Sequence, residues 1–520
     1  MKTGYIVILF VLISTPMLAQ FKAAFESNVT QNQNAIVNRQ ISPKELNRYS
    51  DLLPSQKSFP LSDTIKTQTP DSMKYNMYGD LRDDDPLYYK KSSIGMVVLR
   101  LTLANATTFL IDRYIFNYEF SRVGFNSWKN NFQRGWEWDI DRFAMNYFFH
   151  PYSGSMYFNA ARANGHTFFE SAPFAFLGSL EWEYLAENTQ PAYNDIINTP
   201  INGIFLGEIF YRLGSNILDD QTTGAERFFR EMAVAFLTPT RFFSRLLSGD
   251  ISRLTSTEVY QKEPLNVTLA AGYHKINEGI AIEKGYSSLN LTMHLDYGNP
   301  FEKRTRKPFD FFKVRTDLDF GAGRKIISLI TGYGLLFGKN VQLGSTEMLV
   351  GFFQHMNFFD NRTFELGSIA FGPGIGTKLL IGKNSSLYTN LHVSVIPFGA
   401  LSNRFGPDTT QVRDYNYSNG AEVKLEANYN FNKWVGVAFI GYYWWMHSFS
   451  GIEGNVAGNS YIGLIKPRIT IKLFDNFSLG FEHLIYYSDR YPRDFASVHS
   501  VRTEQRLFVQ LFLEEFKFKK

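Results

Sequence analysis

The feature that most constrains the fold is a two-residue alternation that begins near Leu265 and continues to the end of the chain. In FKVRTDLDF (312–320), apolar residues or Thr alternate with charged ones, and EVKLEANYNF (422–431) and RITIKLF (468–474) repeat the pattern. Successive side chains of a strand point to opposite faces, so each segment has one apolar face and one polar, charge-rich face. A barrel with lipid outside and a polar lumen accommodates both faces, whereas the charged face is awkward in a two-layer sandwich.

The alternating region divides into about twelve segments of roughly ten residues, separated by clusters of Gly, Asn, Asp, Ser and Pro. They start near residues 264, 287, 310, 325, 345, 364, 386, 419, 434, 459, 475 and 502. An even number of strands is typical of bacterial outer-membrane barrels. The last segment, RLFVQLFLEEFKF (506–518), is aromatic and alternating, as expected of a closing strand that the barrel-assembly machinery recognises. Residues 260–520 are therefore predicted to form an antiparallel transmembrane β-barrel.

The N-terminus and the composition predict export. Residues 1–20 have the basic start, short apolar run and small-residue end of a signal peptide. The chain has no Cys, which excludes a lipoprotein anchor on cysteine and disulfides. A net charge of +4 gives no basic excess for nucleic acid, and 16% aromatic residues suit the aromatic girdles of a barrel. A secreted β-sandwich or a soluble lectin-like protein is the competing interpretation.

Two further regions precede the barrel. Residues 21–90 are polar and lack a sustained period, which predicts a periplasmic extension of mostly loop. Residues 91–255 carry helical patterns, which predicts an α+β membrane protein with a helical module before the barrel. The sequence leaves open whether this module plugs the lumen or lies beneath the barrel. Lumen charges of both signs favour a packed or plugged interior, a helical plug included, over a wide pore.

The helical module contains an apolar stretch with many polar residues, DRFAMNYFFHPYSGSMYFNAARANG (141–165). If 138–150 is helical, Asp139, Arg142, Asn146 and His150 share one face. Pro151 is expected to end that helix. A second helix would then begin with Ser153 as its N-cap and end at Gly165.

Carboxylates on the following helices could face His150. Glu183 and Glu187 are four residues apart, and Glu208 is followed four residues later by Arg212. The candidate catalytic residues are His150, Glu183 and Glu208. The candidate polar-network or ligand-binding residues are Asp139, Arg142, Asn146, Tyr152, Ser153, Asn159, Arg162, Glu187 and Asp195.

Three roles are open for these residues: acid–base catalysis by the His and carboxylates, charge pairing that joins helices, or binding of a lipid head group or other ligand. No metal site and no cofactor are predicted, because the chain lacks Cys, HxxxH and HExxH patterns, and nucleotide-binding and nucleophile-elbow motifs.

Three sequence runs carry a family resemblance: WEWDIDRFAMNYFFHPYSGSMYFNAARANG (136–165), GSLEWEYLAE (178–187) and NDIINTPINGIFLGE (194–208). Together they resemble an uncharacterised family of Gram-negative envelope proteins, domain of unknown function 3943, over about residues 100–250. The resemblance implies a cell-envelope location and no particular activity.

The sequence thus predicts an outer-membrane β-barrel protein of a Gram-negative bacterium with its N-terminal region in the periplasm. Its expected role is structural, transport or envelope biogenesis. An envelope lipid-modifying enzyme that uses the His/carboxylate site is the alternative. The expected partners are outer-membrane lipids and, during biogenesis, the barrel-assembly machinery; nucleic acid is not expected, and no specific protein partner can be named.

Overall fold

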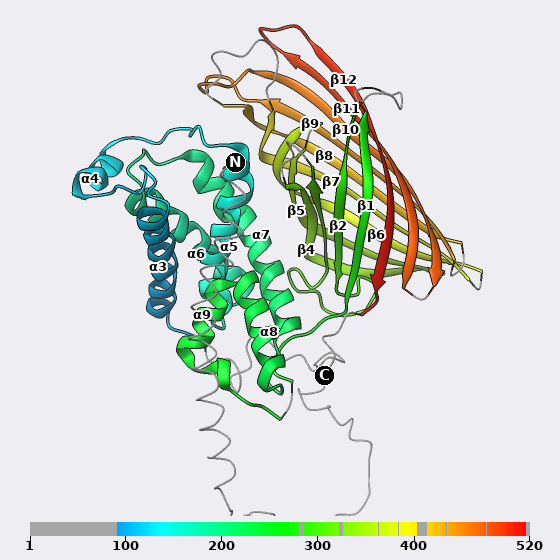
Figure 1. Cartoon of the computed structure of the whole chain (residues 1–520), viewed down its shortest axis with the longest axis horizontal. Coiled ribbons are helices and arrows are strands. Elements are labelled where there is room, and N and C mark those ends of the chain that lie inside the picture. Colours follow the sequence, from blue (N-terminus) through cyan, green and yellow to red (C-terminus); the bar gives the residue numbers. More distant parts are fainter. Residues whose placement is uncertain are drawn as a thin grey trace, which may run out of the picture.

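The computed structural model describes residues 91–515 except 257, 278, 280–284, 322–325, 362, 383, 403–412, 432–433 and 475. The expected signal peptide and the polar extension at 21–90 lie outside these residues. The described chain forms a body of helices beside a β-barrel (Figure 1).

The strands of the barrel are β1 (Leu265–Asn277), β2 (Gly285–Tyr297), β3 (Phe312–Phe320), β4 (Ile327–Leu343), β5 (Thr346–Asp360), β6 (Glu365–Ile381), β7 (Ser385–Ser402), β8 (Tyr415–Asn430), β9 (Val435–Ser448), β10 (Gly458–Phe474), β11 (Phe477–Pro492) and β12 (Val498–Leu513). Each strand pairs with its chain neighbours in antiparallel register, and β1 also pairs with β12, which closes the sheet. The predicted twelve-stranded barrel is confirmed. The strands are 9 to 18 residues long, so most exceed the expected ten. The starts of β8 and β12 precede the predicted ones by four residues.

The connections between strands differ at the two ends of the barrel. At the end where β1 begins and β12 ends, which we call the base, β4 and β5 are separated only by residues 344–345. At the opposite end, the rim, residues 403–414 separate β7 from β8 and residues 449–457 separate β9 from β10. The base turns are thus mostly short, as is usual at one end of outer-membrane barrels, but residues 298–311 between β2 and β3 form a long connection at the base.

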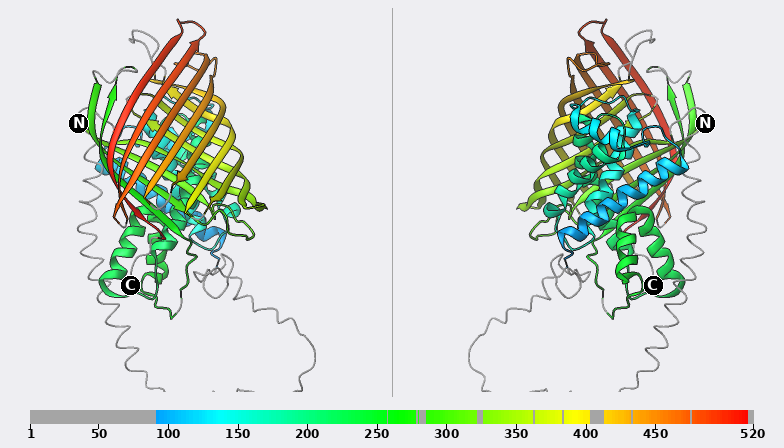
Figure 2. Two further views of the ribbon diagram at one scale, coloured as in Figure 1. Left: turned by 90° about the vertical axis from the view of Figure 1, so that its right-hand side faces the viewer. Right: turned by 90° about the vertical axis from the view of Figure 1, so that its left-hand side faces the viewer.

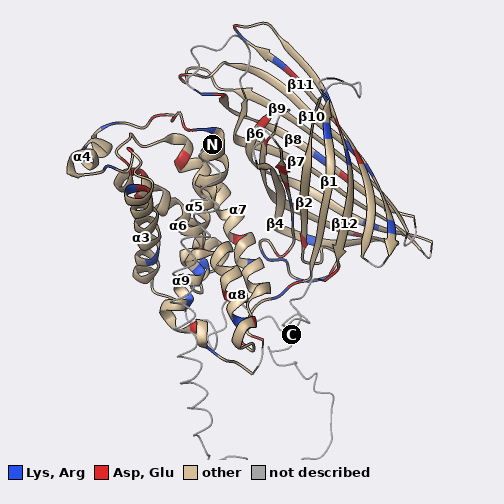
Figure 3. Cartoon of the chain, viewed as in Figure 1, with Lys and Arg blue, Asp and Glu red and all other residues tan. Residues whose placement is uncertain are grey.

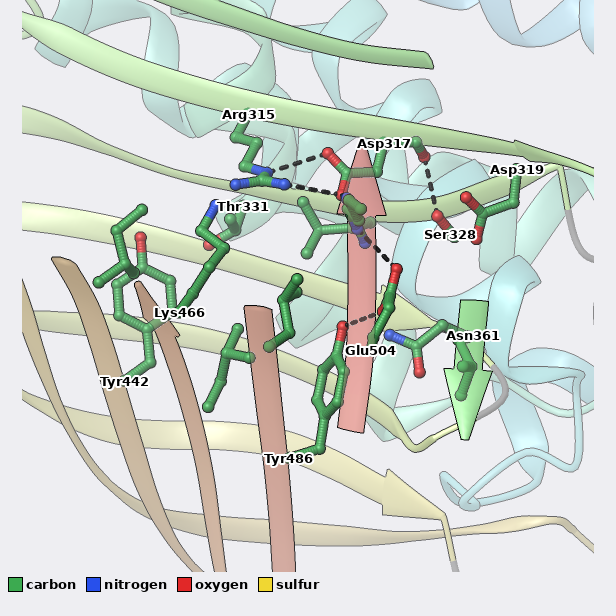
Figure 4. A pocket seen from close by; sticks show the side chains of 16 residues that line it. Arg315, Asp317, Asp319, Ser328, Thr331, Asn361, Tyr442, Lys466, Tyr486 and Glu504 are labelled. Carbon is green, nitrogen blue, oxygen red and sulfur yellow. Dashed lines mark hydrogen bonds and ion pairs between the residues drawn. The ribbon is translucent and has the colours of Figure 1, made fainter. Parts of the chain in front are cut away.

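Ion pairs and hydrogen bonds cross the barrel lumen. Lys313 on β3 lies 3.8 Å from Glu426 on β8, on a nearly opposite wall, and Tyr333 on β4 donates to the same carboxylate at 3.1 Å. Arg506 on β12 lies 2.6 Å from Asp317 on β3. Figure 4 shows Asp317 with Arg315 reaching toward it. These side chains are largely buried, so they narrow the lumen, and those around Asp317 line a cavity inside the barrel.

The outer face of the barrel is apolar between two bands of aromatic side chains. The rim-side band consists of Tyr443, Trp445, Tyr461, Tyr487 and Tyr491, and the base-side band of Phe431, Trp434, Phe474 and Phe477. Ten residue steps separate Phe477 from Tyr487 on β11. At about 3.3 Å per residue and a strand tilt of about 45°, these ten steps correspond to roughly 23 Å along the barrel axis. This height fits the lipid-facing band of a transmembrane barrel, about 25 Å.

The helical elements are α3 (Ile94–Leu110), η2 (Ile111–Ile115), α4 (Phe125–Gln133), η3 (Met145–Phe149), α5 (His150–Arg162), α6 (Phe168–Glu181), η4 (Trp182–Ala186), α7 (Tyr193–Ile217), α8 (Gly224–Leu237), α9 (Pro239–Ser248) and η5 (Asp250–Ser252). We call them together the helical module. Two views at right angles to Figure 1 show the module flat against one side of the strand wall (Figure 2).

The helical module packs on the outside of the barrel wall. Phe205 of α7 lies against Gly332 of β4, and Tyr147 of η3 lies against Gly367 of β6. Gly332 and Gly367 alternate with lumen-facing residues, so both face outward. The expectation of a helical plug, or of a module beneath the barrel, is therefore wrong for the described helices. The large apolar surface on the barrel exterior provides the contact that a narrow polar lumen could not.

The predicted helix boundaries around Pro151 are also wrong. Residues 135–142 are irregular, and one helix runs from Phe143 through Pro151 to Arg162. The π-turn of η3 shifts the hydrogen-bond register, so that the amide of His150 donates to the carbonyl of Met145. The ring of Pro151 is thereby accommodated near the start of α5, where its missing N–H costs little.

The bridged lumen predicts a low conductance. The full chain reconstituted in planar lipid bilayers should show no steady conductance comparable to that of an open porin, because side chains from facing walls meet inside the barrel. The Lys313→Ala/Glu426→Ala double variant removes one bridge and should raise the conductance. An open-porin conductance of the unmodified protein would contradict the packed interior.

Candidate functional site

A group of titratable side chains gathers where the helical module meets the barrel rim. We call it the acidic–histidine cluster, and it comprises Asp139, Asp141, His150, Glu183, Glu187 and Asp195. Tyr417, which contacts the cluster, lies on β8 four residues nearer the rim than Ala421. Ala421 pairs with Trp445 of the rim-side aromatic band. The cluster therefore lies beyond the apolar band of the barrel.

Barrel residues hold Asp139 in place. Tyr417 donates to Asp139 Oδ1 at 2.8 Å, and Asn146 Nδ2 donates to the same oxygen at 2.8 Å. Arg413 donates to the backbone carbonyl of Asp139 at 2.8 Å. Because residues 135–142 have no helical hydrogen bonds of their own, these contacts position the carboxylate.

His150 lies between two carboxylates. Its Nε2 is 3.7 Å from Asp141 Oδ2 and 3.7 Å from Asp195 Oδ1. Both distances exceed hydrogen-bond length, and Nε2 is buried without a hydrogen-bond partner. Asp195, in the first turn of α7, accepts a hydrogen bond from Asn194 Nδ2 at 2.9 Å.

Glu183 and Glu187 complete the cluster from the turn that follows α6. Glu183 accepts a hydrogen bond from the amide of Ala192 at 2.8 Å. Glu187 accepts hydrogen bonds from Trp182 Nε1 and from Thr189 Oγ1. These donors are neutral, so they orient the carboxylates without compensating their charge.

Burial and mutual repulsion shift the protonation of the cluster. Burial raises the pKa of the Asp195 carboxyl well above its usual range, and the neighbouring Asp139 adds to the rise. Burial, reinforced by Glu187, likewise raises the pKa of Glu183. Burial alone would lower the pKa of His150, but the carboxylate of Asp141 and other nearby acids outweigh it and raise that pKa. Burial and mutual repulsion thus disfavour the ionised forms of Asp195 and Glu183, and the acidic–histidine cluster itself contains a single imidazole as counter-charge.

Three other buried carboxylates of the helical module, Glu208, Asp220 and Glu231, are paired with arginine. Glu208 lies 2.7 Å from Arg162 and 2.8 Å from Arg212. Asp220 and Glu231 share the arginines 227 and 245, and Asp220 also pairs with Arg253. The guanidinium of Arg413 contacts the acidic–histidine cluster through the backbone carbonyl of Asp139. Figure 3 shows the position of the charged residues in the module.

The structure divides the predicted site residues between several places. His150, Glu183, Glu187, Asp139, Asn146 and Asp195 lie in or against the cluster. Glu208 does not, because it is thirteen residues after Asp195 on α7, about 20 Å along the helix. With Arg162 it forms the charge pair that the second interpretation predicted.

The remaining predicted residues have other positions. Asn159 is buried and donates to the carbonyls of Ser155 and Gly207, which links α5 to α7. Tyr152 donates to the carbonyl of Phe236 at 3.4 Å. Ser153 is half-buried in the first turns of α5, and Arg142 is exposed. None of the four belongs to the cluster.

Sequence reasoning missed the barrel's contribution to the site. Tyr415 accepts a hydrogen bond from Asn146 Nδ2 at 2.7 Å and donates to the carbonyl of Asp141 at 2.9 Å. Tyr417 and Arg413 hold Asp139. These residues are more than 260 positions from the module residues they contact, and no local pattern signals the contact. Two outward-facing tyrosines at the start of one strand were the single available hint.

The cluster has two chemical capacities. His150 beside carboxylates can accept and release a proton, which is the requirement for general acid–base work. Asp139, His150 and Asp195 also each offer one ligand atom, and these atoms lie within 4.8 Å of one another. Carboxylate and imidazole in this proximity can coordinate a divalent cation.

The fold and site define a closed twelve-stranded barrel with a helical module on its outer wall and a polar site between the two. Residues 135–240, which hold most of that site, match the family described as Domain of unknown function (DUF3943), which confirms the resemblance.

Similar solved structures cover the barrel half of the chain. They include the NanC porin (10% identity, TM-score 0.26, 47% of this chain and 98% of that one). An outer membrane channel from Pseudomonas putida F1 (6%, 0.28, 48% and 96%) and the outer membrane channel DcaP of Acinetobacter baumannii (10%, 0.22, 48% and 96%) are also similar. No curated protein sequence matches the chain.

The contrast between the two kinds of buried carboxylate predicts opposite responses to neutralisation. Glu208→Gln leaves two buried guanidinium groups without their counter-charge and should destabilise the module by about 3 kcal/mol or more. Glu183→Gln removes one of several repelling carboxylates and keeps an oxygen that accepts from Ala192, so stability should stay equal or rise. Thermal unfolding in detergent measures both. An equal loss of stability in the two variants would contradict the interpretation that the carboxyls of the cluster repel one another without a compensating cation.

Proposed function

We propose that the protein is an integral outer-membrane protein of a Gram-negative cell envelope, in which the barrel holds the helical module within the membrane. In this arrangement the acidic–histidine cluster meets lipid head groups. The observation that carries the proposal is the docking of the module on the apolar outer wall of the barrel, the surface that faces hydrocarbon in a transmembrane barrel.

The surface of the module that faces away from the barrel supports membrane embedding. α3 and η2 form a continuous helix, Ile94–Ile115, that is long and apolar enough to cross a membrane, with only 17% of its most apolar stretch buried. Leu99 and Leu103 are about half exposed on it. Exposed apolar side chains of this density are costly in water and favourable in lipid. α7, 25 residues long, spans about 37 Å beside the barrel, comparable to the thickness of a bilayer.

Two features of the barrel support an orientation: four of the five base connections are short, and the barrel segment begins and ends at the base. Short turns and both chain ends of a bacterial barrel usually lie in the periplasm, and longer loops lie outside. The base then faces the periplasm and the rim faces the cell exterior. α3 begins near the level of the base (Figure 1), and we infer from this that the preceding residues, 21–90 included, lie in the periplasm. Insertion by the barrel-assembly machinery stays a prediction.

This orientation places the cluster at the level of outer-leaflet head groups. The Asp141 side chain is 52% exposed, so the cluster is open to its surroundings on one side. An envelope-biogenesis role, in which the module binds the polar part of an outer-membrane lipid, follows from this position. A second candidate, lipid modification, is favoured by His150, which lies between two carboxylates and can transfer protons. Transport through the lumen would first require the ion pairs across it to separate.

Cysteine accessibility tests the embedding of the helical module, because the natural chain has no Cys. Leu103→Cys on the outer face of α3 should resist a water-soluble maleimide in intact membranes and react after the protein is unfolded in detergent. Lys129→Cys on the exposed helix α4 should react in both states. Rapid labelling of Leu103→Cys in intact membranes would contradict the embedding.

Lipid analysis tests the action of the cluster on lipid. Outer membranes from cells that carry His150→Ala should differ in acylation or head-group composition from membranes with an equal amount of the native protein. Mass spectrometry of extracted lipids measures the difference. Arg142→Ala, a change at an exposed residue outside the cluster, is the control and should leave the lipids as in the native strain. Unchanged lipids with folded His150→Ala protein would exclude lipid modification by His150.

A further inference from the structure

We propose that Asp139, His150 and Asp195 bind one divalent transition-metal ion, with Zn²⁺ as the ion that best fits the ligands. This inference rests on the proposed function and deepens it, because it names what would hold an anionic lipid head group at the same site. The three ligands come from three separate segments of the module: the irregular residues 135–142, the start of α5 and the first turn of α7.

The spacing of the ligand atoms fits a shared cation. A zinc ion holds nitrogen and oxygen ligands at about 2.0–2.2 Å, so tetrahedral ligands lie roughly 3.4 Å from each other. His150 Nε2 lies 3.7 Å from Asp195 Oδ1, too far for a hydrogen bond and close to this separation. All three ligand atoms lie within 4.8 Å of one another.

A buried polar atom at the proposed site has no hydrogen-bond partner: His150 Nε2, the expected ligand atom. Buried polar atoms are normally satisfied, and a metal ion bound to Nε2 would satisfy this atom.

Neighbouring donors orient the carboxylate ligands. Asn194 Nδ2 donates to Asp195, and Tyr417 and Asn146 donate to Asp139. Such outer contacts are typical of metal sites, where they fix the direction of each ligand. The donor from β8 means that the site is complete only when the helical module is docked on the barrel.

The charge of the cluster favours a dication. Five carboxyl groups surround one imidazole, and the guanidinium of Arg413 contacts them through the backbone carbonyl of Asp139. A doubly charged ion would lower the cost of burying Asp195 and Glu183. Three protein ligands leave at least one position for water or for a phosphate oxygen. Asp141, which is half exposed, marks the open side.

Metal analysis of the full chain in detergent tests the inference. After treatment with a chelator and dialysis against Zn²⁺ alone, the native protein should retain one equivalent of zinc by elemental mass spectrometry. His150→Gln and Asp195→Asn should each weaken zinc binding at least tenfold. His499→Gln, which removes an exposed histidine paired with Asp489 on the barrel, is the control and should bind as the native protein does.

X-ray absorption of the zinc-loaded native protein provides a test that needs no variant. It should show nitrogen and oxygen ligands at about 2.0–2.2 Å with one imidazole. Absence of zinc, equal binding by the variants and the native protein, or a zinc site without imidazole would overturn the inference. Zinc binding with unchanged lipids in the His150→Ala strain would contradict only the action on lipid. Changed lipids without zinc binding would contradict only the metal site.

Discussion

Closure of the sheet by β1 and β12 is the interaction on which the rest of the structure depends. An open sheet would leave a row of unpaired backbone N–H and C=O groups, which lipid cannot satisfy. The pairing from Val267 with Leu513 to Ile276 with Glu504 removes both edges. Once the backbone is satisfied, the outer face can be apolar between its aromatic bands, and the polar side chains can pair across the lumen.

The apolar outer wall then has two kinds of neighbour. On one side it exposes residues such as Leu473 and Leu507, as a barrel in lipid does. On the other side it carries the helical module, and aromatic side chains such as Phe205 reach glycines of the wall. The helical module covers the outer surface of the barrel wall and not the lumen. On the side of the module away from the barrel, α3 exposes apolar side chains. The barrel and the helical module form one body, and the acidic–histidine cluster lies between them at the rim.

The acidic–histidine cluster differs from the rest of the helical module in its balance of charge. Elsewhere several buried carboxylates have arginine partners, as Glu208 has Arg162 and Arg212, and these pairs hold helices together. At the rim, Asp139, Asp195 and their neighbours face a single imidazole. Buried charge without compensation is unfavourable unless the site binds something. This imbalance distinguishes the cluster from structural ion pairs and underlies both the lipid and the metal proposals.

The sequence by itself determined the barrel, because the alternation of apolar and polar residues is local and each strand shows it. It predicted the closed topology and most strand starts to within two residues. It also marked His150, Glu183 and Asp195 as polar residues in apolar helices. It misplaced the helix ends at Pro151, since a π-turn has no simple sequence signal. Only the tertiary structure decided that the module lies outside the barrel, that Glu208 belongs to a different network, and that Tyr415 and Tyr417 complete the site. Those facts depend on contacts between residues hundreds of positions apart. The periodicity within a segment does not indicate which distant surface that segment packs against.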